Sequence, residues 1–280
     1  MSSLTAFHIF CYGYKHAGSG REFLKSSLDK ATKHDRRRFY SAYGLTPETI
    51  KAIFDDLHTL DIGKSSIRKP NIKFLLMTLN WWKEYRTEEN MAGHWKMSEK
   101  TFEKHVWAYT RAIQALSEHK IKWPFNGDNL PKEIFVLSVD GVHFKVMEMR
   151  QTPDKNFKSV KLGRGAAVSY ELALSIWAGK LVWINGPFPA GEIDLVIYKK
   201  QGGLKSKIPP GKRLIGDKIY LTKNTPEISG RNLYDNEKLG KFKERVKARH
   251  ETFNRRLKSF NILDNRFRSK TDQMNKQNLS

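Results

Sequence analysis

The chain has 280 residues, with 51 lysines and arginines against 29 aspartates and glutamates, a formal charge of +22. Its single cysteine, Cys11, excludes an internal disulfide and a cysteine-based zinc site. No apolar run approaches the roughly 20 residues that a membrane-spanning helix needs. Hydrophobic and aromatic fractions of 39% and 12% are typical of a folded chain. The positive excess predicts a polyanionic partner, but composition alone does not choose between DNA, RNA and an acidic membrane surface.

Residues 1–125 are expected to be mostly helical. Thr46-Pro47-Glu48 is a helix start, with a capping hydroxyl, proline in the first turn and a carboxylate behind it. Apolar residues then recur at helical spacing. Further helices are expected from about Pro70, over residues 88–94, and from Ser98, whose hydroxyl would cap the last of them.

The last two of these helices are typical of a helix-turn-helix, because a short helix and a tight turn precede a capped longer helix. In that arrangement Lys100, Lys104 and His105 would face DNA. A helical bundle with a solvated outer face shows the same pattern, so both interpretations stay open. The tryptophans between Trp81 and Trp123 are expected to belong to the bundle core rather than to stack on bases.

The segment 124–131 is polar and rich in turn residues, which predicts a domain boundary. Beyond it, hydrophobic patterning predicts strands, a short helix and a long basic helix. The expected elements are a strand over 134–139 ending at Asp140-Gly141 with a hairpin partner near 144–149, a second hairpin over 170–184 turning at Ala178-Gly179, a helix over 192–199, a strand over 213–215 leading into Gly216-Asp217, and a helix over about 236–263.

This order of elements matches an RNase H-like fold, which places carboxylates on a first strand, a fourth strand and a late helix. The predicted fold class is therefore α/β, with an RNase H-like catalytic core made of a mixed sheet and flanking helices over residues 130–265. An all-α, helix-turn-helix-like DNA-binding region over residues 1–125 precedes it. A basic polar tail, residues 266–280, follows.

Two aspartates stand where the chemistry of phosphodiester cleavage needs them. Asp140 and Asp217 each follow an apolar strand and lie beside glycine. An acidic group at the end of a buried strand is costly unless it is paired or bound to metal. Magnesium prefers oxygen ligands, and two ions about 3.5–4 Å apart can clamp the attacking and departing oxygens. Taken singly, each aspartate could equally be a turn or cap residue.

Four stretches, VDGVHF, GPFPAGEID, LIGDKIY and RHETFNRRLKSF, resemble in this order the motifs of Harbinger/PIF-type DDE transposases and related bacterial insertion-sequence transposases. The resemblance covers roughly residues 134–263. It implies a metal-dependent DNA endonuclease or transposase whose catalytic, metal-binding carboxylates are Asp140, Asp217 and Glu251. The supporting residues that it implies are Asp194 in the glycine-rich turn, and Arg249 and Asn254 beside the glutamate.

The resemblance also implies cofactors and partners. The protein would hydrolyse a phosphodiester of double-stranded DNA with two Mg²⁺ (or Mn²⁺) ions, and the 3′ hydroxyl could then attack target DNA. A homodimer or larger assembly is expected, and some such elements use a separate DNA-binding partner protein. Nuclear location is expected if the host is eukaryotic, and cytoplasmic location otherwise. The alternatives are a domesticated or inactive transposase that binds DNA without cutting it, and an RNA-binding protein whose motifs match by chance.

Helical geometry argues against Glu251 as the third ligand. Phe242, Val246, Phe253 and Leu257 share one face of the late helix, and Glu251 projects from the opposite side. Glu244 lies two turns earlier on the same face as Glu251 and is the rival ligand. A solvated glutamate among basic neighbours is the third interpretation.

A basic segment precedes the strand that leads to Asp217, and it is expected near the site. Residues 199–213 contain six basic side chains and no acidic one. Contacts from such side chains to phosphates position DNA without reading its sequence. The predicted DNA-binding residues here are Lys199, Lys200, Lys205, Lys207, Lys212 and Arg213, together with Arg255 on the late helix.

Overall fold

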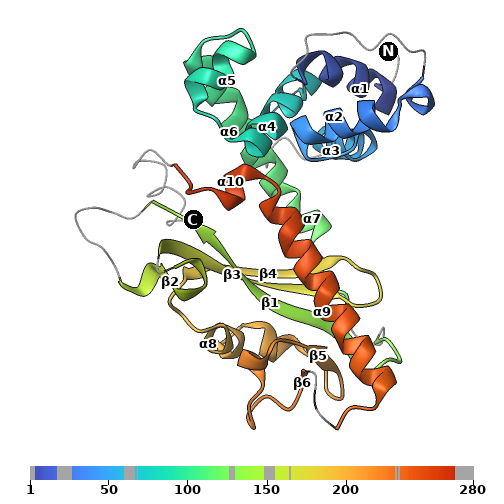
Figure 1. Cartoon of the computed structure of the whole chain (residues 1–280), viewed down its shortest axis with the longest axis vertical. Coiled ribbons are helices and arrows are strands. Elements are labelled where there is room, and N and C mark those ends of the chain that lie inside the picture. The colour runs from blue at the N-terminus through green and yellow to red at the C-terminus, as the bar shows by residue number, and fades with distance from the viewer. Residues whose placement is uncertain are drawn as a thin grey trace. The chain divides into compact units, whose positions relative to one another are not determined.

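A computed structural model describes residues 4–17, 27–59, 67, 69–125, 130–147, 155–163, 165–230, 232 and 234–268. The chain forms two compact units (Figure 1). We call residues 1–120 with 259–262 the helical unit, and residues 121–258 with 263–280 the sheet unit. No helix among the described residues is long and apolar enough to cross a membrane.

The described part of the helical unit is mainly α-helical. They are α1 (Ala6–His16), α2 (Lys33–Tyr43), α3 (Pro47–Thr59), α4 (Ile72–Glu84), α5 (Glu88–His94), α6 (Glu99–Ala115) and α7 (Ser117–Lys120), with a 3-10 turn at Leu28–Lys30. The Ser98 side chain caps α6 by accepting from the Thr101 amide, as expected. Trp81, Trp95 and Trp107 are buried, which confirms that they belong to the core. The prediction is wrong for Trp123, which packs against the core of the sheet unit instead.

Among its described residues the sheet unit contains six strands, β1 (Phe135–Lys145), β2 (Lys158–Ser159), β3 (Gly165–Ser175), β4 (Leu181–Pro189), β5 (Arg213–Ile215) and β6 (Ile228–Ser229). The sheet order is β2-β3-β1-β5-β6, with β4 also paired to β3. The pairs β1–β3 and β3–β4 are antiparallel, whereas β1–β5 and β5–β6 are parallel. Helices α8 (Asp194–Lys199), α9 (Glu237–Lys258) and α10 (Asn261–Asp264) complete the elements, with 3-10 turns at Lys155–Phe157, Val160–Leu162, Leu204–Lys207 and Lys218–Tyr220. The fold is thus mixed α/β with a mixed sheet and flanking helices.

The predicted end of the first strand at Asp140-Gly141 is wrong. β1 runs through both residues to Lys145, and β3 pairs with it over this whole length, out to Lys145 opposite Ala167. The glycine is needed for close approach instead of a turn, because a Cβ atom on Gly141 would lie 2.4 Å from Asp194 Oδ1. The expected hairpin partner is therefore absent from residues 144–147, and residues 148–149 lie outside the described part of the chain.

Helix α9 also ends earlier than predicted. It stops at Lys258 rather than near Leu263, and the short α10 follows after a break at Ser259-Phe260. Of the predicted tail, residues 266–268 are described and 269–280 lie outside the described residues. The second hairpin, the short helix and the strand before Gly216 agree with the expectation, since β3, β4, α8 and β5 occupy those positions.

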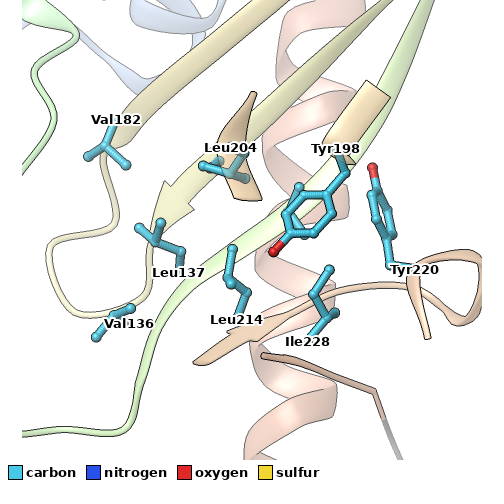
Figure 2. Packing of buried hydrophobic residues seen from close by; sticks show 10 residues of the cluster. Val136, Leu137, Val182, Tyr198, Leu204, Leu214, Tyr220 and Ile228 are labelled. Carbon is cyan, nitrogen blue, oxygen red and sulfur yellow. The ribbon is translucent and has the colours of Figure 1, made fainter. Parts of the chain in front are cut away.

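Alternation along β1 separates the two faces of the sheet, because successive side chains of a strand point to opposite sides. Ser138 contacts His250 of α9, with 2.9 Å between Oγ and Nδ1. Val139 belongs to the core cluster on the other face, together with Tyr198 of α8. Figure 2 shows part of this core, where the rings of Tyr198 and Tyr220 meet edge to face with their centroids 6.1 Å apart. Asp140 therefore faces α9, and Gly141 faces α8.

Candidate active site

Two aspartates lie at the same level of neighbouring parallel strands. Ser138 of β1 pairs with Ile215 of β5, and Asp140 and Asp217 each lie two residues beyond that pair. Neighbouring strands are about 4.8 Å apart. Both aspartates line one pocket of about 110 Å³, and Glu251 of α9 lines it with them. The structure thus brings together the three carboxylates that the motifs indicated.

Asp140 is the most enclosed of the three carboxylates. Asn254 of α9 donates from Nδ2 to Asp140 Oδ2 at 2.8 Å, and the Gly141 amide donates to Oδ1 at 2.9 Å. Burial raises the pKa of Asp140 above its usual value, against a lowering by Lys161, while Asp194 and Asp217 add to the rise. A carboxylate that is costly to ionise, with other acidic groups nearby, is typical of a functional site.

Asp217 follows β5 and is more open. Its side chain is 57% exposed, and Lys247 Nζ lies 2.8 Å from its Oδ1 atom. The hydrogen bond from Lys247 is the main reason that the pKa of Asp217 lies below its usual value. Lys247 itself lines the pocket, so a cationic side chain stands beside the carboxylates.

Glu251 reaches the pocket although the helical projection argued against it. The projection counted Phe253 and Leu257 among the packing residues, but both are only half-buried. The residues of α9 that are fully buried are Lys243, Val246 and His250. Because His250 packs on Ser138, the neighbouring stripe of Lys247, Glu251 and Asn254 faces the strands at helical spacing.

The rival ligand lies elsewhere on the same helix. Glu244 lines a different pocket, together with Lys238, Lys241 and Arg245. Seven residues of helix separate Glu244 from Glu251, a rise of about 10 Å. The sequence pattern left the two glutamates as alternatives, and the geometry favours Glu251.

The histidines beside the acidic residues make hydrogen bonds within the fold. Burial lowers the pKa of His250 to about 4, so its imidazole is neutral at pH 7. His143 Nδ1 lies 2.7 Å from Ser159 Oγ on the face of the sheet that carries α8.

The three predicted supporting residues have different positions. Asn254 touches Asp140 directly. Asp194 is 4% exposed, begins α8 and lies against Gly141, on the other face of the sheet from the pocket. Burial alone would raise the pKa of Asp194, but interactions with His143 and Lys161 outweigh it and hold the pKa below its usual value. The Arg249 guanidinium donates to the Ile176 carbonyl and so anchors α9 to the turn after β3.

The predicted DNA-binding residues of the helical unit differ in accessibility. Lys100 and Lys104 are exposed in the first turns of α6. His105 is half-buried and stacks on Phe74, with ring centroids 3.6 Å apart and nearly parallel planes. Burial is the main cause that lowers the pKa of His105, and the charges of Lys104 and Lys73 lower it further. The stacked ring is therefore less available to DNA than the two lysines.

The predicted basic segment of the sheet unit does not gather around the carboxylates as a whole. Arg213 pairs with Phe135 at the start of β1, so it lies at the opposite end of β5 from Asp217. Several of these side chains are engaged in the fold: Lys200 with Glu192, Lys205 with the Asn224 carbonyl, Lys207 over the Trp183 ring, Lys212 with the carbonyls of Pro131 and Glu133, and Arg213 with the Pro226 carbonyl. Lys199 is exposed at the end of α8, and Arg255 is exposed on α9.

One lysine that lines the pocket, Lys247, is not among the predicted DNA-binding residues. Lys247 lies four residues before Glu251, which is one helical turn on the same face. This four-residue spacing is visible in the sequence. Lys247 was not predicted to line the pocket because the helical projection placed this face of α9 away from the sheet.

The donor set suits a hard divalent ion. Carboxylate oxygens are the ligands that magnesium prefers, and Asn254 Oδ1 is a further buried oxygen that has no hydrogen-bond partner among the described residues. Lys247 donates a hydrogen bond to Asp217, and Asn254 donates one to Asp140. No group of three or more His, Cys, Asp or Glu side chains among the described residues is placed to hold a metal ion as it stands. Asp140, Asp217 and Glu251 line one pocket and are the side chains that would hold such an ion.

The fold and site together define a basic α/β protein with three carboxylates in one pocket. The chain is similar to a protein described as the probable transposase for insertion sequence element IS702 of Microchaete diplosiphon. The two are 25% identical over 260 residues, which cover 87% of this chain and 91% of that protein. No family model matches the chain, and no solved structure matches it.

Because the similarity extends over nearly the whole of both chains, it supports a transposase-related protein. The similar protein is bacterial. The similarity therefore lends no support to the Harbinger/PIF subtype in particular or to a nuclear location.

Proposed function

We propose that the protein is a DDE-type transposase or endonuclease that cleaves phosphodiester bonds of double-stranded DNA. The observation that carries the proposal is the meeting of Asp140, Asp217 and Glu251 in one pocket, from three separate elements. Similarity to a transposase over most of the chain and the charge of +22 support it. We further propose that the sheet unit is RNase H-like. What supports this is a mixed sheet in which β1 and the neighbouring parallel β5 lead to Asp140 and Asp217, followed by the late helix α9 that carries Glu251.

The proposed cofactor is Mg²⁺ or Mn²⁺, as two ions held by Asp140, Asp217 and Glu251. Such ions activate the attacking water and stabilise the departing oxygen when they are bound. The chain's own part is to position the ligands. Asn254 and the Gly141 amide fix both oxygens of Asp140, and the Ser138–His250 contact fixes the level at which α9 crosses the strands. Lys247 places a positive charge where a scissile phosphate would meet the carboxylates.

The finer parts of the proposal concern partners. The α5–turn–α6 segment is proposed to contact duplex DNA through Lys100 and Lys104, which are exposed at the start of α6. A homodimer or larger assembly is proposed because two ends of a mobile element must be held together. A separate DNA-binding partner protein and strand transfer by the new 3′ hydroxyl belong to the same proposal. If the host is bacterial, as it is for the similar protein, the proposed location is the cytoplasm.

A second candidate function is DNA binding without cleavage, by an inactive or domesticated transposase. Two observations favour it: Lys247 pairs with Asp217 at 2.8 Å, and the described acidic groups do not form a ready metal site. DNA would then be bound by the exposed basic side chains described above, and the carboxylates would have no catalytic role.

Nicking of supercoiled plasmid with and without Mg²⁺ or Mn²⁺ separates the two functions. The proposal predicts metal-dependent nicking by the wild-type protein and its loss in Asp140→Asn and Asp217→Asn. DNA binding should persist in both variants. Binding with no nicking under either metal would instead support the non-catalytic candidate.

A further inference from the structure

A second groove adjoins the carboxylate pocket on the sheet unit. It has a volume of about 360 Å³ and lies between the later part of β1, the 3-10 turn Val160–Leu162 and the last turns of α9. Glu251 lines both the groove and the pocket, so the two are continuous at that residue. The groove's basic side chains are Lys161, Arg255 and Lys258.

The fold neutralises only part of the positive charge of this groove. Neither Arg255 nor Lys258 makes an ion pair with any residue that the structure describes. Both lie on the face of α9 that carries Glu251, since Lys258 is seven residues beyond it and Arg255 is four beyond it. Lys161 pairs with Asp194, so Arg255 and Lys258 against Glu251 leave the groove with a positive balance, which suits an anionic ligand.

Lys161 is held in place by Asp194 and by the backbone of Gly141. Its Nζ atom lies 2.8 Å from Asp194 Oδ2 and 3.4 Å from the Gly141 carbonyl oxygen. Asp194 is 4% exposed whereas the Lys161 side chain is 48% exposed, so a buried carboxylate holds a half-exposed ammonium group at the groove wall. An ammonium group has three N–H donors, and these two contacts leave one for a ligand in the groove.

The carboxylate of Asp194 can reach this position because residue 141 is glycine. A Cβ atom at residue 141 would lie 2.4 Å from Asp194 Oδ1 and 2.8 Å from its Cγ. Because Gly141 has no side chain, the Asp194 carboxylate can lie against it, and this carboxylate in turn orients Lys161. This gives the glycine-rich turn before α8 a role near the site although it lies on the other face of the sheet.

We propose that this groove binds backbone phosphates of the DNA strand adjacent to the scissile phosphate. Lys161, Arg255 and Lys258 are the phosphate-contacting residues, and Asp194 is a positioning residue that acts through Lys161. The identity of the ligand as DNA rests on the proposed function. Phosphate contacts of this kind set the position of the strand without reading its bases.

Binding of a fluorescent 30-base-pair duplex tests the groove, measured by anisotropy in EDTA over a range of salt concentrations. Each phosphate contact contributes about 0.9 to the slope of log K against log salt. Lys161→Gln, Arg255→Gln and Lys258→Gln should each weaken binding several-fold at low salt and lower the slope by about 0.9. Lys238→Gln is the matched control, because Lys238 is exposed in the first turn of α9, about 25 Å along the helix from Arg255.

A double-mutant cycle tests the positioning role of Asp194. Asp194→Asn should weaken DNA binding in the wild-type background and have little further effect in the Lys161→Gln background. Lys161→Arg, which keeps the positive charge, should retain most of the affinity. An equal loss from Asp194→Asn in both backgrounds would show that Asp194 acts through the general stability of the fold, and the positioning role would be wrong.

The outcomes distinguish failure of this inference from failure of the proposed function. A wild-type protein that neither binds duplex DNA nor nicks it would overturn both. A wild-type protein that nicks DNA, while the three groove variants keep the slope of Lys238→Gln, would overturn the groove and leave the nuclease intact. Arg255→Gln decides the matter if Lys161→Gln fails to fold, because Arg255 is exposed and makes no ion pair with the described residues.

Discussion

Asp140 shows how one carboxylate is prepared by the residues around it. One of its oxygens accepts from the amide of the next residue, and the other accepts from Asn254, which is 114 positions later in the chain. Burial and the neighbouring acidic groups make its ionisation costly, while a cation or a donor reduces that cost. The side chain is thus oriented by the protein before any ligand arrives.

Replacement of Asn254 by alanine should slow cleavage without abolishing DNA binding. The amide orients Asp140, and loss of a residue that orients a metal ligand costs roughly 10- to 100-fold in metal affinity or activity. Thr252→Ala is the control, since Thr252 is exposed on the same helix and bonds only to the Ala248 carbonyl. Initial nicking rates at several Mg²⁺ concentrations measure the effect. Equal rates for the two variants would contradict the role given to Asn254.

Glu171 is an acidic residue that the proposed chemistry does not use. It is 2% exposed on β3, opposite Gly141, and accepts from Trp183 Nε1 at 3.1 Å. Its other oxygen, Oε1, is buried with no partner among the described residues. Burial raises the pKa of Glu171 to about 7, with a smaller contribution from Asp194.

This raised pKa predicts a pH-dependent stability. The folded chain keeps the Glu171 proton up to about pH 7, whereas the unfolded chain releases it near pH 4.5. The free energy of unfolding should therefore fall as pH rises from about 4.5 and level off above about 7, a loss on the order of 3 kcal/mol. Urea denaturation at pH 5 and pH 8 measures it, and Glu171→Gln should remove most of the difference. A variant with the same pH dependence as wild type would refute the assignment.

At the level of elements, hydrophobic patterning predicted most of the sheet unit. The strand before Gly216, the short α8 and the β3–β4 hairpin follow from runs of apolar residues broken by turn residues. The continuation of β1 beyond Asp140 was missed because glycine usually signals a turn, whereas here it admits the Asp194 carboxylate. The orientation of α9 was missed because two apolar residues on it, Phe253 and Leu257, are only half-buried. Contacts between residues far apart in the chain cannot be predicted from the local sequence pattern.

Gly141→Ala tests the contact between β1 and α8. The added Cβ atom would meet Asp194 Oδ1 at 2.4 Å, so the carboxylate or the strand must shift. We expect the free energy of unfolding to fall by about 1–3 kcal/mol, as for other overpacked positions. Gly240→Ala provides the opposite control, because a Cβ atom there meets nothing within 4 Å. Alanine in that helix should stabilise the protein by about 0.5–1 kcal/mol. Chemical denaturation of both variants measures the difference, and equal effects would contradict the close approach.

For the whole molecule, charge was the most direct sequence signal. An excess of +22 predicts a polyanionic partner, and the described structure places positive side chains beside the three carboxylates. The motifs indicated Asp140, Asp217 and Glu251. The contacts that Lys161 and Lys247 make near these carboxylates depend on the arrangement of the sheet and α9, so they could not be derived from the motifs. In the helical unit, α6 is capped and exposes Lys100 and Lys104. These are the features of the predicted helix-turn-helix that the structure of this unit shows.

The net charge predicts that binding of the full chain to duplex DNA weakens steeply with salt. Each phosphate that the protein neutralises releases counterions, and six to ten such contacts cost on the order of 10³ to 10⁵ in affinity between 50 and 200 mM salt. Anisotropy titrations at four salt concentrations with two unrelated duplexes measure this. An affinity that does not change over this range would show that DNA is not bound through its phosphates.

The central claim is that Asp140, Asp217 and Glu251 form one metal-dependent nuclease site. The initial rate of plasmid nicking by Glu251→Gln, compared with Glu244→Gln, tests it most directly because both glutamates lie on α9 and only Glu251 lines the pocket. The structure predicts that Glu251→Gln abolishes metal-dependent nicking and that Glu244→Gln retains it, with DNA binding preserved in both. Retained nicking in Glu251→Gln together with its loss in Glu244→Gln would contradict the site described above.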